Sequence, residues 1–305
     1  MKKFVKKLII YIAVVFLSIV ILFFIIDAIG WSDHNYKRFT SKGQQSLIVG
    51  TSRAAQGIQP LIINEKLSST KFKLPIYNFS FNVGESPYGE LYFNAIKRKL
   101  GQNNDRNSIF IVSVDPFGLA VEKMQDGDKY REYGRTLDKI RHFYKPQIYY
   151  LFNYCRPEKW RCMGYQTLHD DGWLEINVKF DSLSLKENIK RKMDDYNSYV
   201  ITPSDYRTHW LVETIKLFKQ NGTVFMCHIP MSCEMSEWED RSWPDFDKKM
   251  YEIAEQLDVC YFAFKENRNN YRTTDGNHLF KDDGALFTSD LCDSIIAVIL
   301  DSSIR

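Results

Sequence analysis

Short apolar segments that alternate with helix-like segments are the feature that most constrains the fold of this 305-residue chain. Each apolar segment is bounded by polar or turn-forming residues, as is typical of buried strands. The five segments cover residues 46–49, 76–81, 108–114, 223–228 and 259–264. Segments with apolar residues three or four positions apart predict helices at 87–100, 209–219, 245–257 and 284–300. This alternation predicts an α/β fold with a mainly parallel, doubly wound sheet.

The N-terminus is different in kind, because four lysines precede a run of nineteen residues, 8–26, without a formal charge. A helix of that length is about 28 Å long and spans a hydrocarbon core. A cleaved signal peptide is the alternative, but it usually has a shorter apolar run and a small-residue cleavage site. The sequence favours an uncleaved signal-anchor over residues 1–30. The lysines predict that this end is cytoplasmic and that residues 31–305 form an extracytoplasmic domain.

The charge balance argues against nucleic acid as a partner. Residues 1–30 hold four lysines and one aspartate, a net charge of +3, and the whole chain also carries +3. The remainder is therefore neutral overall. The basic tip needs only the inner leaflet of the membrane to explain it.

Residues 117–205 interrupt the alternation with a segment rich in Tyr, Trp, Arg and Lys. We interpret it as an insertion at the rim of the sheet, either a lid or substrate lobe or a packing appendage. Cys155 and Cys162 flank a polar loop and form the best candidate disulfide, whereas Cys227 and Cys260 lie in strand-like runs and are expected to be buried thiols. No CxxC motif or Cys/His cluster has zinc-like spacing, so we expect no metal and no cofactor.

Two motifs carry candidate chemistry. "LIVGTSR" ends the first predicted strand at Ser52, and "TTDGNHLF" places Asp275 three residues before His278, between the last strand and the last helix. Each motif alone has a simpler explanation, since serines after strands often cap helices and Asp–His pairs are common in surface turns. Together they would meet at the carboxyl edge of a parallel sheet. A serine nucleophile needs a base, and the base needs an orienting acid.

Three blocks, "IVGTSR", "YNFSFNVGESP" and "DGNHL", resemble the SGNH (GDSL-like) hydrolase superfamily. The likeness is to its membrane-anchored, extracytoplasmic members related to the alginate O-acetylation and lipoteichoic acid D-alanylation proteins. It covers most of residues 45–300 apart from the insertion. The resemblance implies a three-layer α/β/α sandwich of the flavodoxin-like type. It also implies Ser52 as nucleophile, His278 as general base and Asp275 as orienting acid.

This sequence departs from the family pattern at the residues that form the oxyanion hole. The resemblance implies an amide at the serine block and a glycine after the second strand, which Gly84 supplies with Asn82 as a neighbouring amide. Asp115 stands where the family has an asparagine, and a carboxylate there would repel an oxyanion. We therefore expect Asp115 to be structural. Arg53 either binds an anionic group of the substrate or is itself a solvated side chain in the first turn of the helix. His228 is more readily explained as a hydrogen-bonded structural residue.

The resemblance implies a serine esterase or O-acyltransferase that acts through an acyl-enzyme on ester-linked acyl groups of cell-envelope glycans. The implied partners are an acylated glycan or acyl donor, the membrane, and a membrane acyltransferase in polysaccharide acylation. Water and a sugar hydroxyl remain equal alternatives as acceptor. A catalytically weak module that binds glycan or assists an envelope acylation complex is the second alternative, because fold does not guarantee activity. A dinucleotide-dependent oxidoreductase is disfavoured, because "GTSRAAQG" lacks the G-x-G-x-x-G pattern.

Overall fold

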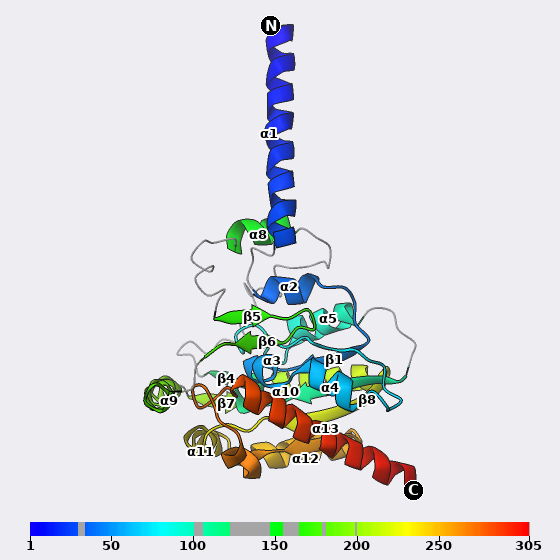
Figure 1. Cartoon of the computed structure of the whole chain (residues 1–305), viewed down its shortest axis with the longest axis vertical. Coiled ribbons are helices and arrows are strands. Elements are labelled where there is room, and N and C mark those ends of the chain that lie inside the picture. Colours follow the sequence, from blue (N-terminus) through cyan, green and yellow to red (C-terminus); the bar gives the residue numbers. More distant parts are fainter. Residues whose placement is uncertain are drawn as a thin grey trace.

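A long N-terminal helix stands away from an α/β domain in the computed structural model of this chain (Figure 1). The structure describes residues 1–29, 34–100, 106–122, 147–154, 165–178, 181–198 and 200–304. Helix α1 (Lys2–Ile29) is long and apolar enough to cross a membrane, and most of it is exposed. The short helix α2 (His34–Thr40) leads into the domain.

A five-stranded parallel sheet forms the centre of the domain, with the strand order β2-β1-β3-β8-β9. The strands are β1 (Ser46–Val49), β2 (Ile76–Asn78), β3 (Ser108–Ser113), β8 (Gly222–His228) and β9 (Cys260–Ala263). All five predicted strands are confirmed. Strand β2 ends at Asn78, three residues earlier than predicted. The Asn78 side chain accepts from the Ser80 amide and donates to the carbonyls of Ala54 and Ile58.

Side chains of the strands alternate between two apolar clusters, as the period of a pleated strand requires. Leu47 and Val49 belong to one cluster and Ile48 to the other. The first cluster includes residues of α5 (Glu90–Lys99), α10 (Asp205–Lys219) and α12 (Phe246–Gln256). The second includes residues of α3 (Ser52–Gly57), α4 (Pro60–Lys66) and α13 (Lys281–Ile304).

The four predicted helices are present with shifted ends. Helix α5 begins three residues later than predicted, at Glu90, after the extended Gly89. Helix α10 begins four residues earlier than predicted, because Ser204 caps it by accepting a hydrogen bond from the Arg207 amide. Helix α11 (Cys233–Ser242) was not predicted, since its sequence "CEMSEWEDRS" has few apolar residues.

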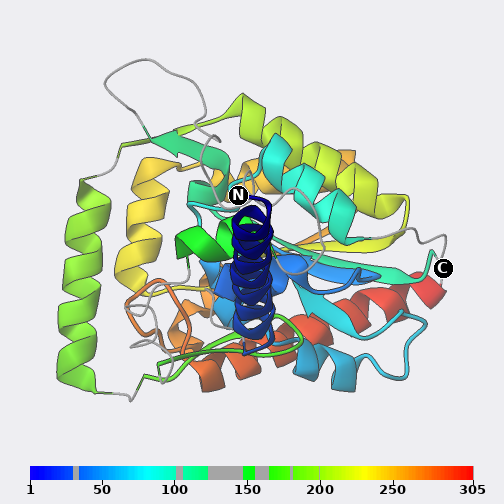
Figure 2. The ribbon, with the colours of Figure 1, turned by 90° about the horizontal axis from the view of Figure 1, so that it is seen from above.

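The predicted insertion contains regular elements that the sequence did not indicate. Strands β4 (Ala120–Glu122) and β7 (Ile201–Pro203) pair antiparallel, so its two ends lie side by side. Its other described elements are α6 (Pro116–Leu119), α8 (Ile148–Tyr154), β5 (Gln166–Leu168), β6 (Leu174–Ile176) and α9 (Ser182–Asn197). Helix α9 lies at one side of the molecule, away from the sheet (Figure 2). Cys155 and Cys162 lie outside the described residues, whereas Cys227 and Cys260 are free thiols, the first buried and the second half-buried.

The hairpin of β5 and β6 covers the exposed edge of β2. The Asn78 amide donates to the Asp171 carbonyl at 2.8 Å, and Arg38 Nε donates to the Gly172 carbonyl at 2.8 Å. Gly172 has φ +86°, and a Cβ there would lie 2.2 Å from the Asn78 carbonyl oxygen. Only glycine fits this turn, so Gly172 allows the hairpin to lie directly against the edge of β2.

We expect Gly172→Ala to destabilise the domain by about 2 kcal/mol or more, because it adds a left-handed backbone cost to a clash with β2. Thermal unfolding of the full chain in detergent measures the loss. Gly84→Ala is the matched control, since the added Cβ would meet only the flexible Asn82 side chain, at 3.1 Å. Equal melting temperatures for the two variants would contradict the proposed packing of the hairpin.

Candidate functional site

Ser52 begins helix α3, three residues after the end of strand β1. Its Oγ lies 2.9 Å from His278 Nε2, a pair separated by 226 residues in the sequence. The serine is therefore not a helix cap, because its hydroxyl is directed to the imidazole. Gly50 allows the chain just before Ser52 to pass close to β3, since a Cβ at residue 50 would lie 2.8 Å from the Ser113 Cβ.

The loop before α13 holds His278 by a compact turn. Asp275 Oδ1 accepts hydrogen bonds from the amides of Asn277 and His278, at 3.0 and 2.9 Å. Asp275 Oδ2 lies 3.0 Å from His278 Nδ1. Gly276 adopts φ +86°, which the turn requires. The carboxylate thus fixes the loop through its amides and the orientation of the ring through Nδ1.

The environment of Asp275 keeps its carboxyl group ionised. Burial alone would raise the pKa of Asp275, but His278 and Lys192 outweigh it and hold that pKa well below its usual range. Lys192 belongs to α9 of the insertion, and its Nζ lies 3.8 Å from Asp275 Oδ2. The insertion therefore reaches the triad-like cluster, which we define as Ser52, His278 and Asp275.

Both carboxylate oxygens of Asp115 are hydrogen-bonded within the protein, as expected of a structural residue. Its Oδ2 accepts from Thr51 Oγ1 at 2.6 Å, and its Oδ1 accepts from the Gly118 amide at 2.8 Å. Thr51 stands at the N-cap of α3 but makes no side-chain capping bond there. The Thr51 hydroxyl therefore accepts no hydrogen bond from the first turn of α3, so the amides of Ser52 and Arg53 can serve as donors.

Asn82 and Gly84 lie in an exposed turn after β2. The turn is tied to the same edge of the sheet as Ser52, because the Phe81 amide and the Ser86 hydroxyl both donate to the Gly50 carbonyl. This arrangement keeps the two predicted oxyanion residues beside the end of β1.

Arg53 is buried rather than solvated, with 3% of its side chain exposed. Its Nε donates to Asn277 Oδ1 at 2.7 Å, and one terminal nitrogen donates to Glu239 Oε1 at 2.6 Å. Two of the three guanidinium nitrogens are thus bound by groups of the protein, whereas the other terminal nitrogen is buried without a hydrogen-bond partner among the described residues. Because Asn277 precedes His278, Arg53 joins the helix that carries Ser52 to the loop that carries the base.

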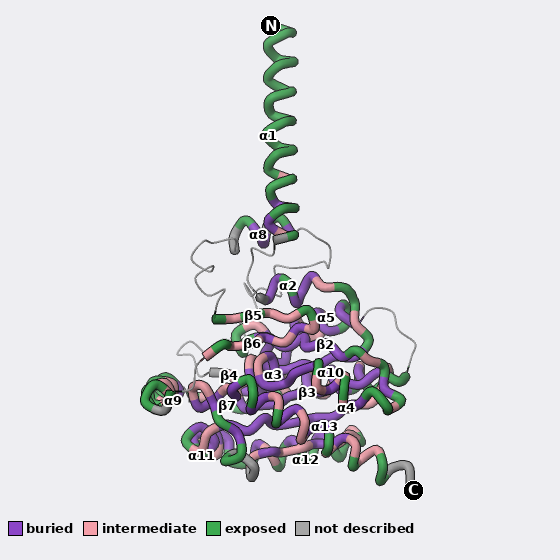
Figure 3. Tube along the Cα trace, viewed as in Figure 1, coloured by how far each residue is buried: buried purple, intermediate pink, exposed green. Residues whose placement is uncertain are grey.

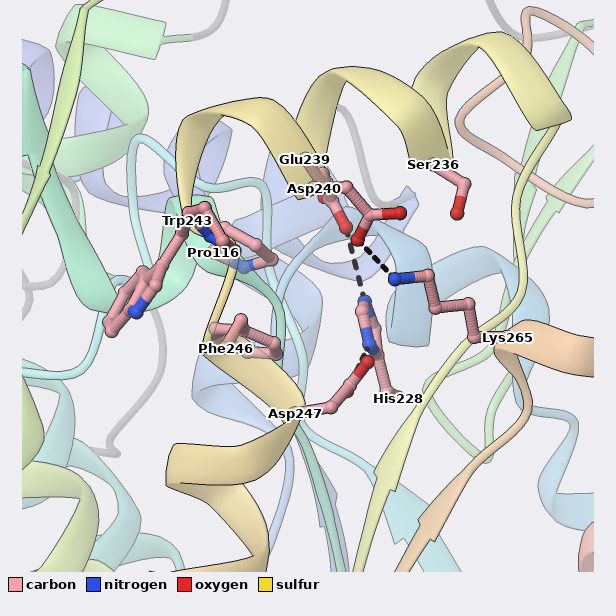
Figure 4. A pocket seen from close by; sticks show the side chains of 10 residues that line it. Pro116, His228, Ser236, Glu239, Asp240, Trp243, Phe246, Asp247 and Lys265 are labelled. Atoms are coloured by element: carbon pink, nitrogen blue, oxygen red, sulfur yellow. Dashed lines mark hydrogen bonds and ion pairs between the residues drawn. The ribbon is translucent and has the colours of Figure 1, made fainter.

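Glu239 continues this network to His228, at the end of strand β8. His228 Nε2 lies 3.2 Å from Glu239 Oε2, and His228 Nδ1 lies 3.0 Å from Asp247 Oδ1. These groups line a polar hollow between β8, α11 and α12 (Figure 4). The interpretation of His228 as a buried, hydrogen-bonded residue is confirmed.

Neighbouring groups of opposite charge stabilise the ionised forms of His228 and Glu239. Burial disfavours the cation of His228, but Asp247 and Glu239 outweigh burial and raise the pKa of His228 to about 9. Burial likewise disfavours the Glu239 carboxylate, but Arg53 and His228 hold the pKa of Glu239 below its ordinary value. Sequence reasoning missed the Arg53–Glu239 pair because no local pattern links positions 186 residues apart.

No protein-family model matches this chain, and no curated protein matches it significantly.

The free energy of unfolding is expected to fall as the pH rises from about 6.5 to about 9. The pKa of His228 in the folded protein, about 9, exceeds the ordinary value of 6.5. Its stabilising contribution is therefore complete below pH 6.5 and lost through pH 9, a difference on the order of 3 kcal/mol. Melting temperatures of the full chain in detergent at a series of pH values measure this loss.

The matched control is His228→Asn, which removes the titrating group. The variant should be less stable overall and should show a flatter dependence on pH over the same interval. If wild type and variant lose stability in parallel, His228 is not the group that titrates.

Proposed function

We propose that this protein is a serine esterase or O-acyltransferase that forms an acyl-enzyme at Ser52. One observation carries the proposal: Ser52, His278 and Asp275 form an unbroken line of contacts of 2.9 and 3.0 Å. A hydroxyl, an imidazole and a carboxylate in this order are the components of an activated serine nucleophile. Within hydrogen-bond distance, the imidazole can take the hydroxyl proton as the oxygen attacks.

The reaction proceeds in two balanced halves. Ser52 Oγ attacks the ester carbonyl while His278 Nε2 takes its proton, and Asp275 stabilises the resulting imidazolium. Collapse of the tetrahedral intermediate breaks the bond to the leaving alcohol, which receives the proton from His278. Water or a sugar hydroxyl then attacks the acyl-enzyme and gives its proton to His278. His278 returns that proton to Ser52 Oγ as the bond to the acyl group breaks and the acyl group leaves as an acid or a new ester.

The proposed fold type is a three-layer α/β/α sandwich, the flavodoxin-like arrangement of SGNH hydrolases. The strand order β2-β1-β3-β8-β9 supports this assignment, because β1 lies where the order reverses. Open α/β sheets bind ligands at the carboxyl ends of strands at such a switch point. Ser52 follows β1 at that edge.

The oxyanion donors we propose are the first-turn amides of α3, together with Gly84 and Asn82 once the turn approaches the substrate. The family asparagine is replaced by Asp115, whose oxygens are engaged by Thr51 and Gly118. Loss of one oxyanion donor typically costs about 2.7–4 kcal/mol of transition-state stabilisation. We therefore expect a slow enzyme or one with a specialised substrate.

The proposed location is the outer face of a membrane, with α1 as a single anchor whose basic end is cytoplasmic. Helix length and composition support the anchor, and the lysines at positions 2, 3, 6 and 7 support the orientation. The proposed substrates are ester-linked acyl groups of cell-envelope glycans. A membrane acyltransferase would supply the acyl group if the protein is a transferase.

A fluorophosphonate probe tests the nucleophile on the full chain in detergent. We expect one label by intact mass, no label in Ser52→Ala or His278→Ala, and a labelling rate roughly 10⁴-fold lower in Asp275→Asn. The control Ser68→Ala removes an exposed surface hydroxyl and should label as wild type does. A folded wild-type protein that takes up no label would contradict the proposed nucleophile, and so would a Ser52→Ala protein that is still labelled.

The acceptor is identified with p-nitrophenyl acetate as acyl donor. A transferase should release p-nitrophenol faster when a cell-wall oligosaccharide is added, and the sugar should gain an acetyl group by mass. An esterase should release it at the same rate with or without the sugar.

A module that binds glycan or assists an acylation complex without catalysis is the second candidate. The replacement of the family asparagine by a structurally engaged Asp115 favours it. It predicts an unlabelled, folded protein whose glycan affinity is unchanged in Ser52→Ala.

A further inference from the structure

Helix α1 is joined to the domain by packing at its carboxyl end. Phe23 and Ile26 are only 9% and 8% exposed, although most of α1 is exposed (Figure 3). They belong to the same apolar cluster as Tyr150 and Leu151 of α8, and α8 packs against α1. The last turns of the proposed anchor are therefore part of the folded domain.

Hydrogen bonds through Tyr36 reinforce this junction. The Tyr36 hydroxyl donates to Asp27 Oδ1 at 2.8 Å and accepts from the Gln147 amide at 2.9 Å. The Tyr36 ring stacks on Tyr150, with centroids 5.3 Å apart. The residue before α8 is thus two hydrogen bonds from the end of α1, so α8 is held at a defined height along the anchor.

Two of the described side chains of α8 are apolar and exposed. Ile148 is 43% exposed and Phe152 is 77% exposed. They are four positions apart and share one face of the helix. The sequence of α8, "IYYLFNY", has no charged residue. In Figure 1 the helix lies crosswise at the base of α1.

The position of α8 along α1 indicates which environment the exposed side chains of Ile148 and Phe152 meet. The uncharged run of α1 covers residues 8–26 and is about 28 Å long, the thickness of a hydrocarbon core. Its last turn contains Phe23 and Ile26, the residues buried in the cluster shared with α8. A run that crosses the core therefore places α8 at the boundary between hydrocarbon and headgroups, where aromatic side chains are favoured.

We propose that α8 is a membrane-contact segment, in which Ile148 and Phe152 insert into the lipid interface beside α1. The occupant of the face that Ile148 and Phe152 share is the phospholipid bilayer. The inference rests on the membrane placement proposed for α1 and not on the chemistry at Ser52. A two-point attachment, one helix across the bilayer and one on its surface, would hold the domain in a fixed orientation to the membrane.

Photocrosslinking of the full chain in phosphatidylcholine–phosphatidylglycerol nanodiscs tests the contact. The photoreactive residue p-benzoylphenylalanine replaces Phe152 in one variant, Phe16 of α1 in a second and Tyr251 of α12 in a third. Phe16 and Tyr251 are 68% and 51% exposed, so all three positions are accessible. Intact mass after irradiation detects a covalent lipid adduct, and circular dichroism checks that each variant is folded.

We expect lipid adducts at positions 16 and 152 and none at 251. Adducts at 16 without adducts at 152 would overturn the α8 contact and leave the anchor intact. No adduct at either position would overturn both. A crosslink from 152 to a second copy of the chain, seen as a doubled mass, would show that protein covers this face. Fluorophosphonate labelling of Ser52 is measured separately, so its failure is distinguishable from each of these results.

Discussion

The parallel pairing of β1 between β2 and β3 is the constraint on which the site depends. Ile48 pairs with Asn78 on one side and with Ile111 on the other. This register brings Gly50 against Ser113 with no room for a side chain, and α3 then begins at Ser52. Asn78 ties the following segment down through the carbonyls of Ala54 and Ile58. The position of the hydroxyl is thus a consequence of backbone packing in the centre of the sheet.

A line of charges, buried except for the half-buried Asp247, extends from this centre past the end of β8. Arg53, Glu239, His228 and Asp247 alternate in sign, so each charge compensates its neighbours in a low-dielectric interior. Arg53 also binds Asn277, beside the imidazole that contacts Ser52. The network therefore fixes the distance between the two halves of the triad-like cluster. Such a role explains why an arginine directly follows the serine.

The insertion links the sheet, the cluster and the junction with α1. Its hairpin covers the edge of β2, α9 brings Lys192 to Asp275, and α8 packs on the end of α1. A lobe with these three contacts links the end of α1 to the loop that holds His278. The two interpretations left open by the sequence, a substrate lobe and a packing appendage, are therefore not exclusive.

Local pattern in the sequence determined the five strands, four of the helices, the apolar N-terminal run and the D-x-x-H turn. These features depend on the period of apolar residues and on turn chemistry within a few positions, which one sequence displays directly. Helices α9 and α11 were not predicted, because their mostly polar faces weaken the periodicity of apolar residues. Asp115 was expected to be structural on charge grounds alone, and its bonds to Thr51 and Gly118 provide the reason.

Only the tertiary structure decided where Arg53 points, that Lys192 stands by Asp275, and that α8 meets α1. Each is a contact between residues far apart in the chain, and a side chain's partners depend on how the elements pack rather than on its neighbours in sequence. The contact between Ser52 and His278 was predicted only in part from the sequence. The motifs suggested it, but the contact exists because parallel strands bring their carboxyl ends to one edge of the sheet.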